Sequence, residues 1–498
     1  MKRALGTLAI VAWTLLAYWP SLRGPFLWDD GLNVTGNRLV TQPGGLSRIW
    51  FSTEPLDYYP VTFTVFRLQW HCWGNQPLGY RAVNLLLHII NALLLWRIFR
   101  ALSLPGAWWA ALLFALHPVN VATVAWITEL KNLLAFAFAA LTVLAWLRWE
   151  PTARPVWLAA SLGAFLLALL SKTAVAPLPL VLLGITWWRQ KRLAWREATP
   201  LFALALALGL VAIWFQHHRV LEGVPVRRTD VLARIADAGW AVWFYLGKAV
   251  LPLNLSLVYP RWETNGIPAA LLALALTWCW LRSRGAFLAL GGFVAMMFPM
   301  LGFFDQGFYA YSLVADHWQY LALPLLLAAV AGASLRWFVG AAAAVALGWL
   351  TTARATLYAD EVALWRDTLE KNPSAWVAHF NLGLALRHRG DRSSAERCYR
   401  ETLRLNPDHV EAHNNLGNLL SESGRHREAV KHFVAVLRLN PRVPAAHNNL
   451  GVALARLGQY EAAAECFREA LRLDPAHAEA RENLRMALTR LKDNEPKP

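Results

Sequence analysis

The chain has 498 residues, of which 57% are hydrophobic and only 16% are charged; this composition excludes a disordered, collagen-like or ordinary soluble protein. Residues 1–352 contain 39 charged side chains, whereas the much shorter segment 353–498 contains 41. Of the net charge of +16, +13 lies in the apolar part, where Lys and Arg flanking membrane helices explain it better than nucleic-acid binding does. We therefore predict a membrane domain over 1–352, a soluble domain over 353–498 and no nucleic-acid partner.

The first apolar run, Ala4–Trp19, follows Lys2 and Arg3, and no small-residue cleavage site comes after it. This pattern favours an uncleaved membrane span over a secretory signal peptide. Further apolar runs approach the roughly 20 residues that cross a bilayer, so we predict an all-α, polytopic helix bundle of about eleven spans. The later spans are expected at about 78–100, 107–123, 130–148, 155–171, 174–189, 199–215, 266–281, 286–303, 318–335 and 337–352.

The segments between these runs indicate an orientation. Residues 21–77 form a first outer loop, and residues 236–253 are apolar but contain Lys248, which favours an interfacial or re-entrant helix within an outer loop over 216–265. With the N-terminus inside, every inner segment is basic, in keeping with the positive-inside rule. Eleven of the 13 acidic residues before residue 353 then lie in or next to outer loops. Acid–base chemistry is therefore expected on the outer side, and the C-terminal domain is expected in the same compartment.

The C-terminal part repeats every 34 residues, with Asn-Leu-Gly beginning at Asn381, Asn415 and Asn449. This period, with Gly and Ala at the helix contacts, is the tetratricopeptide pattern of paired helices that stack into an α-solenoid. The three asparagines share one position on helices that line the concave face, so we predict that their amides bind an acceptor peptide; hydrogen bonding within the repeats is the alternative. Three repeats are expected at about 376–409, 410–443 and 444–477, with a half repeat at 361–371 and a capping helix at 478–491.

An acidic pair, Asp29 and Asp30, lies about ten residues beyond the first span. Two adjacent carboxylates at a membrane surface are costly unless they are solvated, paired or used in chemistry. Mutual repulsion and partial burial raise a carboxyl pKa toward the range of a general base. Either aspartate is therefore a candidate catalytic base, and a solvated loop pair is the alternative.

The second span carries polar residues on one helix face: Arg81, Asn84, His88 and Asn91. Such a stripe faces the interior of a bundle or an aqueous cavity, or it forms hydrogen bonds between helices. Arg81 lies near the outer end, where it is a candidate for an anionic lipid headgroup.

Other titratable residues gather at the expected outer ends of later spans. Lys172 stands alone in the turn between two spans, where a cation binds a phosphate or extends its head toward water. No metal-ligand cluster or Gly-rich phosphate loop stands out, so we predict neither a metal nor a cofactor. The remaining candidates for a donor site are His117, Glu129, Lys131, Asp316 and His317.

Six stretches, in this order and followed by the repeats, resemble the transmembrane and tetratricopeptide-repeat O-mannosyltransferases and their bacterial relatives, which are lipid-dependent C-type glycosyltransferases. The stretches span almost the whole membrane part. They are Phe26–Asn37 (FLWDDGLNVTGN), Tyr59–Thr62, Gly79–Asn91, Leu113–Asn132, Leu170–Pro179 (LSKTAVAPLP) and Ala315–Leu321 (ADHWQYL). Two positions depart from the pattern: Ala122 stands where animal members have Glu, and Arg81 replaces an expected His.

The resemblance implies an inverting, metal-independent transfer of a sugar, mannose or similar, from a polyprenyl-phosphate carrier to protein Ser/Thr hydroxyls. The repeats would present the acceptor protein, in the periplasm beside a bacterial inner membrane or in the lumen of an ER-type membrane. The alternative is a non-catalytic, membrane-anchored scaffold for envelope or secretion assemblies. A transporter is disfavoured, because a transport path is polar from both faces.

Overall fold

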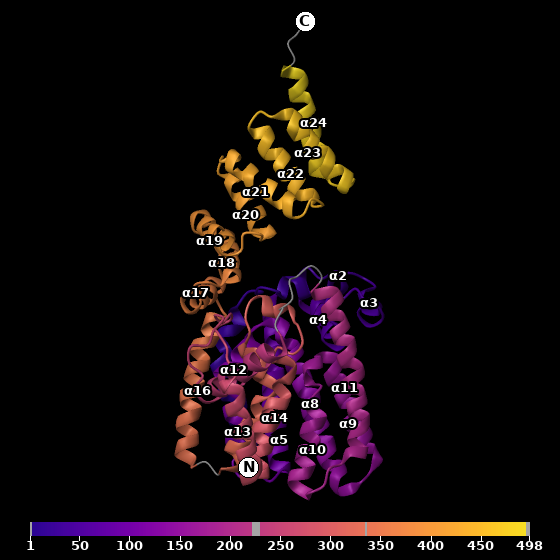
Figure 1. The fold of residues 1–498 in the computed structure, drawn as a ribbon, viewed down its shortest axis with the longest axis vertical. Helices are drawn as coiled ribbons and strands as arrows, with labels where there is room; N and C mark the ends of the chain where they lie inside the picture. The colour runs from indigo at the N-terminus through magenta and orange to yellow at the C-terminus, as the bar shows by residue number, and fades with distance from the viewer. Residues whose placement is uncertain (1, 222–229, 334–335, 495–498) are drawn as a thin grey trace. The chain divides into compact units, whose positions relative to one another are not determined.

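The computed structural model describes residues 2–221, 230–333 and 336–494, which form helices and no strand. The chain divides into two compact units, Met1–Asp367 and Thr368–Pro498, whose helices are drawn in Figure 1. The boundary expected at 352/353 falls inside helix α16 (Trp337–Leu357). The helix continues past this point because the hydroxyls of its threonines find hydrogen-bond acceptors. Thr352 donates to the Gly348 carbonyl of the same helix (2.9 Å), and Thr351 donates to the Leu116 carbonyl (2.7 Å).

The first unit contains many apolar helices. Five helical stretches among the described residues are long and apolar enough to cross a membrane: Arg3–Arg23, Pro77–Ala101, Ile127–Thr152, Trp195–Val220 and Trp337–Leu357. Four shorter apolar helices accompany them: Pro155–Ser171, Ile267–Arg282, Arg284–Met300 and Leu323–Gly332. The all-helical fold is confirmed, whereas the count of eleven spans stays a prediction.

A sixth candidate span is broken in the middle. Helix α6 (Ala107–Ala115) and the stretch Pro118–Ala125 are bent by 47°. Proline lacks the N–H that would continue the helix and forces the preceding residue into an extended conformation, as His117 shows with φ −78° and ψ 123°. The break therefore follows from His117-Pro118 and leads the chain into the short helices before Glu129.

Helix α12 (Val231–Val250) corresponds to the predicted interfacial helix over 236–253. The Asp230 side chain caps it by accepting a hydrogen bond from the Ala233 amide (2.7 Å). One face is buried through Val242 and Tyr245, while Leu232 and Trp243 are exposed. Apolar side chains therefore lie on both the buried and the exposed sides of the helix, and its position at a membrane surface stays a prediction.

The second unit is built from helix pairs that begin at Trp376, Val410 and Pro444. These are α18 (Trp376–His388) with α19 (Arg392–Leu405), α20 (Val410–Glu422) with α21 (His426–Leu439), α22 (Pro444–Arg456) with α23 (Tyr460–Leu473), and the single helix α24 (Ala478–Asn494). Helix α17 (Glu361–Lys371) precedes them.

Each pair is closed by contacts that recur at the 34-residue period. Gly417 lies against the Phe433 ring so closely that a Cβ there would come within 2.7 Å of it, and Gly383 and Gly451 do the same with Tyr399 and Phe467. The glycines therefore permit the close crossing of the two helices. A histidine ring on each first helix also bonds the proline carbonyl six residues earlier, as His413 does with Pro407 (2.9 Å).

Candidate functional site

The first outer loop is fixed by a buried arginine. Arg81, on helix α5 (Pro77–Ala101), is 1% exposed and donates to the carbonyls of Ser21 (2.9 Å), Ala125 (2.6 Å) and Pro25. These acceptors lie in the loop after helix α1 (Lys2–Tyr18) and at the end of α7 (Val121–Ala125). Arg81 therefore braces the loop in this structure, and its predicted contact with an anionic headgroup stays a prediction.

Asp30 is fully buried, and both of its carboxylate oxygens are engaged. Its Oδ1 accepts from the Thr128 amide (2.8 Å) and hydroxyl (2.5 Å), and its Oδ2 accepts from the Leu27 amide (2.8 Å). Burial raises the pKa of Asp30, and the hydrogen bonds from Thr128 and Leu27 oppose that rise. Asp30 thus ties the first outer loop to the segment before Glu129.

Asp29 is only half-buried and is less completely bonded. Its Oδ2 accepts from the Asn33 amide (3.1 Å), while its buried Oδ1 accepts no hydrogen bond from any described residue. Burial raises the pKa of Asp29 to about 7; the Lys131 charge and the nearby Thr128 side chain oppose this rise, and the carboxylates of Asp30 and Glu129 add to it. Asp29 therefore has an unused oxygen and titrates near neutral pH.

The residue before Asp29 is held in an uncommon conformation. Trp28 has φ +40°, a region in which a bulky residue is strained by about 1–3 kcal/mol. Its indole stacks on Trp126 (5.4 Å between centroids, 8° between planes) and meets the edges of Tyr311 (5.3 Å) and Trp365 (5.5 Å). These aromatic contacts offset the strain and hold the chain immediately before the acidic pair.

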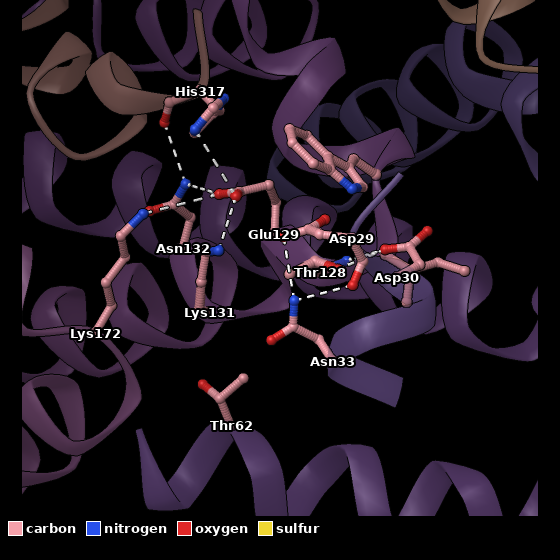
Figure 2. Close-up of polar contacts among 12 residues, drawn as sticks. Asp29, Asp30, Asn33, Thr62, Thr128, Glu129, Lys131, Asn132, Lys172 and His317 are labelled. Carbon is pink, nitrogen blue, oxygen red and sulfur yellow. Dashed lines mark hydrogen bonds and ion pairs between the residues drawn. The ribbon is translucent and has the colours of Figure 1, made fainter. Parts of the chain in front are cut away.

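A second charged cluster is centred on the buried Glu129, at the start of helix α8 (Leu130–Thr152) (Figure 2). Its carboxylate lies 3.2 Å from the Lys131 ammonium, 3.8 Å from the Lys172 ammonium and 3.8 Å from the His317 ring nitrogen. Asn132 donates to the same carboxylate and to the His317 carbonyl (3.1 Å). One carboxylate thus gathers side chains from three separate parts of the sequence.

Lys172, like His317, lies farther from the Glu129 carboxylate than Lys131 does. At 3.8 Å from Glu129 its ammonium is beyond hydrogen-bonding distance, and burial lowers its pKa to about 8. Burial also lowers the pKa of His317 to about 4, so the ring is neutral at pH 7. The turn that carries Lys172 is fixed from the first outer loop, because Thr62 donates to the Ser171 carbonyl (2.9 Å). Lys172 is therefore a buried cation that keeps hydrogen-bond donors for another acceptor.

Four of the nine predicted donor-site residues meet in this cluster, namely Glu129, Lys131, Lys172 and His317. The other five lie in other contacts. Arg81 braces the loop, Asn84 donates to the Trp126 carbonyl (3.1 Å), His88 bonds the Tyr320 hydroxyl (2.9 Å), His117 bonds the Ala249 carbonyl (3.0 Å) and Asp316 accepts from the Tyr259 hydroxyl (2.7 Å). These contacts join segments of the bundle to one another.

The sequence reading missed several residues of the site. Thr128 and Asn132 lie inside a stretch quoted for the resemblance, but nothing local marks them as partners of Asp30 and Glu129. Asp57 is a third carboxylate near Lys131 and Lys172, and the Gln216 amide donates to it (2.5 Å). Burial raises the pKa of Asp57, and the two lysines oppose the rise. Its acidic character and its place in the first outer loop were the available signals.

In the repeats, the three predicted asparagines use their amides differently. The Asn381 amide donates to the Val377 carbonyl of its own helix (2.8 Å), and the Asn449 amide donates to the side-chain oxygens of Asn414 (3.4 Å) and Asn418 (3.0 Å) in the preceding repeat. Asn415 is partly exposed. The amides of Asn381 and Asn449 therefore take part in hydrogen bonds within the solenoid, which is the alternative considered from the sequence.

Comparisons with known proteins agree with the repeats and with the resemblance. Family models described as tetratricopeptide repeat match residues 374–442, 415–478 and 453–494. The chain is 28% identical over 147 residues to protein O-mannosyl-transferase F38B6.6 of Caenorhabditis elegans, and 28% identical over 169 residues to protein O-mannosyl-transferase TMTC4 of Homo sapiens. These alignments cover 26% and 29% of this chain but only 21% and 22% of the relatives.

Among solved structures, a crystal structure of the MamA protein is 18% identical, covers 26% of this chain and 72% of that chain, and gives a TM-score of 0.26. The matches of the family models, together with the helix pairs of the second unit, identify the C-terminal part as a tetratricopeptide-repeat array. The similarity of the chain to the protein O-mannosyl-transferases is confirmed over about a quarter of its length.

Proposed function

We propose that the protein is an integral membrane glycosyltransferase that moves a sugar, mannose or similar, from a polyprenyl-phosphate carrier to Ser/Thr hydroxyls of proteins. The observation that carries this proposal is Asp29, whose free oxygen and pKa of about 7 suit a general base. Thr128 holds Asp30 next to Asp29 through a hydrogen bond. The residue after Thr128 is Glu129, whose carboxylate lies 3.2 Å from the Lys131 ammonium and 3.8 Å from the Lys172 ammonium. The similarity to protein O-mannosyl-transferases supports the same reaction class.

In the proposed reaction, Asp29 accepts the proton of a Ser or Thr hydroxyl as its oxygen attacks the anomeric carbon. The bond from that carbon to the carrier phosphate breaks, and its electron pair leaves with the phosphate. Lys172 then donates hydrogen bonds to the departing anion. A single base without a covalent intermediate gives inversion at the anomeric carbon. We expect no metal requirement, so a chelator should leave the rate unchanged.

An apolar cavity supports a lipid-linked donor. It has a volume of about 460 Å³ and lies among helices α5, α8, α10 (Leu178–Gln190), α14 (Arg284–Met297) and α15 (Leu323–Gly332). Leu178 and Leu321, which line it, follow Lys172 and His317 by six and four residues. A polyprenyl tail in this cavity would place its phosphate near those two side chains.

The repeats are proposed to hold the acceptor protein on the side of the membrane that carries the acidic pair. This side would be the periplasm beside a bacterial inner membrane, or the lumen of an ER-type membrane. A reporter fused after Pro498 tests the compartment. Exposure of the reporter on the inner side would contradict this arrangement.

The proposed activity is tested with purified full-length Asp29→Asn and Asp30→Asn proteins, a polyprenyl-phosphate-mannose donor and an unstructured Ser/Thr peptide. General bases contribute roughly 10²–10⁴-fold to rate, so Asp29→Asn should lose at least about 100-fold in transfer with an unchanged melting temperature. Asp30→Asn should instead lower the melting temperature, because it disturbs the loop tie. Equal transfer by wild type and Asp29→Asn would contradict the role of Asp29 as the base, whereas no transfer above background by the wild-type protein would favour the non-catalytic scaffold.

A further inference from the structure

Asp57, in the first outer loop, has no part in the proposed transfer step, although it lies in the same region of the first unit. Burial raises its pKa, and the charges of Lys131 and Lys172 are close enough to oppose that rise. The same stretch of chain also contacts the turn that carries Lys172, because Thr62 donates to the Ser171 carbonyl (2.9 Å). Asp57 is therefore a carboxylate close to the cation that is proposed to meet the carrier phosphate.

Asp57 is held from outside its loop by the end of helix α11 (Trp195–Phe215). The Gln216 side-chain nitrogen donates to Asp57 Oδ1 (2.5 Å). Beside this bond, the ring of Phe215 packs on that of Tyr58, with 5.4 Å between the centroids. The position of the Asp57 carboxylate is therefore set by a helix that is 159 residues away in sequence.

The contact with Gln216 leaves another polar atom without a partner. Gln216 Oε1 is enclosed and accepts no hydrogen bond from any described residue. An enclosed acceptor without a donor costs free energy comparable to what a hydrogen bond contributes. The contact therefore adds little to stability, and its effect is to fix the direction of the Asp57 carboxylate.

The second oxygen of Asp57 is open. Within the described chain, Asp57 Oδ2 and the Tyr59 hydroxyl form no hydrogen bond, and neither is an enclosed atom. Burial raises the pKa of Tyr59, and the carboxylates of Asp57 and Glu129 add to the rise, so the hydroxyl lies close to both. An ionised carboxylate can only accept hydrogen bonds, and it repels a phosphate. The group that Asp57 binds must therefore be an uncharged donor.

We propose that Asp57 binds a hydroxyl group of the donor sugar and that Gln216 positions Asp57 for this contact. The inference rests on the proposed function and names a determinant of which sugars are accepted. In a lipid-linked donor the sugar is bonded directly to the phosphate, so a phosphate held by Lys172 brings the sugar hydroxyls toward Asp57. A hydrogen bond to a charged acceptor is about twice as strong as one between neutral groups. A sugar that lacks the matching hydroxyl should therefore bind more weakly.

The test measures binding to the purified full chain, without acceptor, of polyprenyl-phosphate-mannose and of the same polyprenyl phosphate without the sugar. Asp57→Asn keeps the shape of the side chain and an oxygen for Gln216 but removes the charge. It should weaken binding of the mannose lipid about tenfold or more. The bare phosphate should bind as tightly as before or more tightly, because a nearby negative charge is gone.

Donor analogues that each lack one sugar hydroxyl identify the contact. One of them should bind wild type about tenfold more weakly than the mannose lipid does, and Asp57→Asn should cause no further loss for that analogue, because the two changes remove the same hydrogen bond. An equal additional loss from Asp57→Asn with every analogue would overturn the assignment of a sugar hydroxyl to Asp57.

Two further variants separate recognition from fold. Gln216→Leu removes the donor and the enclosed oxygen together, so it should reduce the preference for the mannose lipid severalfold without lowering the melting temperature. Glu54→Gln neutralises an exposed carboxylate of the same loop, which pairs with Arg48, and should change neither affinity. An unchanged preference in Gln216→Leu would overturn its positioning role.

The outcomes also distinguish this inference from the proposed function. If Asp57→Asn changes the affinity for both lipids by the same factor, or for neither, Asp57 acts on the phosphate or on the fold, and the inference is wrong while the proposed function stands. If wild type binds neither lipid, the proposed function itself is contradicted, and the inference fails with it.

Discussion

Thr128 donates from both its amide and its hydroxyl to a single oxygen of Asp30, at 2.8 Å and 2.5 Å, across 98 residues of sequence. Because both of these hydrogen bonds go to Asp30, the two adjacent aspartates have different roles. Asp30 is saturated and fixes the first outer loop, while Asp29 keeps a free oxygen beside it. The acidic pair is thus one structural residue and one candidate base.

The Thr128 hydroxyl is expected to matter for stability. Thr128→Val removes it without changing the shape of the side chain and leaves a buried carboxylate with one donor fewer, which costs about 1–3 kcal/mol. The melting temperature of the purified protein should fall accordingly. Thr128→Ser, which keeps the hydroxyl, is the matched control and should melt close to wild type; equal melting temperatures for Val and wild type would contradict the role given to this bond.

The rate should have a narrow pH optimum. Asp29 must be ionised to accept a proton, so with its pKa raised to about 7, kcat/KM for the acceptor should rise as pH increases through 7. Lys172 must be charged to meet the phosphate, and with its pKa lowered to about 8 the rate should fall above pH 8. Measurement of kcat/KM for the acceptor from pH 5 to 10, in steps smaller than the ~1 unit over which a single group titrates, checks both the rise and the fall.

Lys172→Arg gives this profile a specific control. Arginine stays protonated over the whole range, so the fall in rate above pH 8 should disappear while the rise through pH 7 remains. A profile without that rise would contradict the assignment of Asp29.

Asp29 also makes the free energy of unfolding depend on pH, in the direction opposite to that of a carboxylate whose pKa is lowered by folding. Its folded pKa lies above its unfolded value, so its contribution is present at low pH and is lost as pH rises toward 7.

Trp28 is expected to position Asp29. Trp28→Gly accepts the φ of +40° without strain but removes the ring that stacks on Trp126, so kcat should fall about tenfold or more from misplacement of the base. Trp28→Phe should lie between the two. Trp19→Phe changes an exposed ring near the same loop and should leave kcat unaltered; if Trp28→Gly also leaves it unaltered, the stack has no positioning role.

The apolar cavity offers a test of carrier binding. Ala140 lines it and is 4% exposed, whereas its neighbour Leu141 is 43% exposed. Ala140→Phe should fill part of the cavity and raise KM for a long-chain donor, with little change for a short-chain analogue. Leu141→Phe places the same ring outside the cavity and should change neither value. Equal effects of both substitutions on both donors would show that the cavity does not take the tail.

The helices of the solenoid begin at residues that the sequence predicted, because the features that define them are local. The glycine and aromatic partners lie within one repeat, and the period repeats them three times. The end of the membrane part was less predictable. The change from a sparsely charged to a charge-rich segment suggested a boundary at 352/353, but the hydroxyls of Thr351 and Thr352 donate to carbonyls, and the helix continues to Leu357.

The candidate site was predictable by residue type but not by pairing. Acidic and basic residues at outer ends of spans pointed to Asp29, Glu129 and Lys172, which lie in one region of the first unit. From its place on helix α5, Arg81 looked equally suitable as a ligand of the donor phosphate. Its guanidinium nitrogens instead donate to three backbone carbonyls. Distinguishing a ligand-binding cation from a brace requires the positions of backbone acceptors that are far away in sequence.

The hydrogen bonds between repeats have a consequence for how such arrays change in length. The Asn449 amide donates to the side-chain oxygens of Asn414 and Asn418 in the repeat before it, and the Asn483 amide of α24 donates to Asn448. A duplicated 34-residue unit that kept residues 444–477 in this pattern would bring its own bond to the preceding repeat. The array can therefore lengthen by whole repeats while the contacts on either side of the insertion keep their geometry.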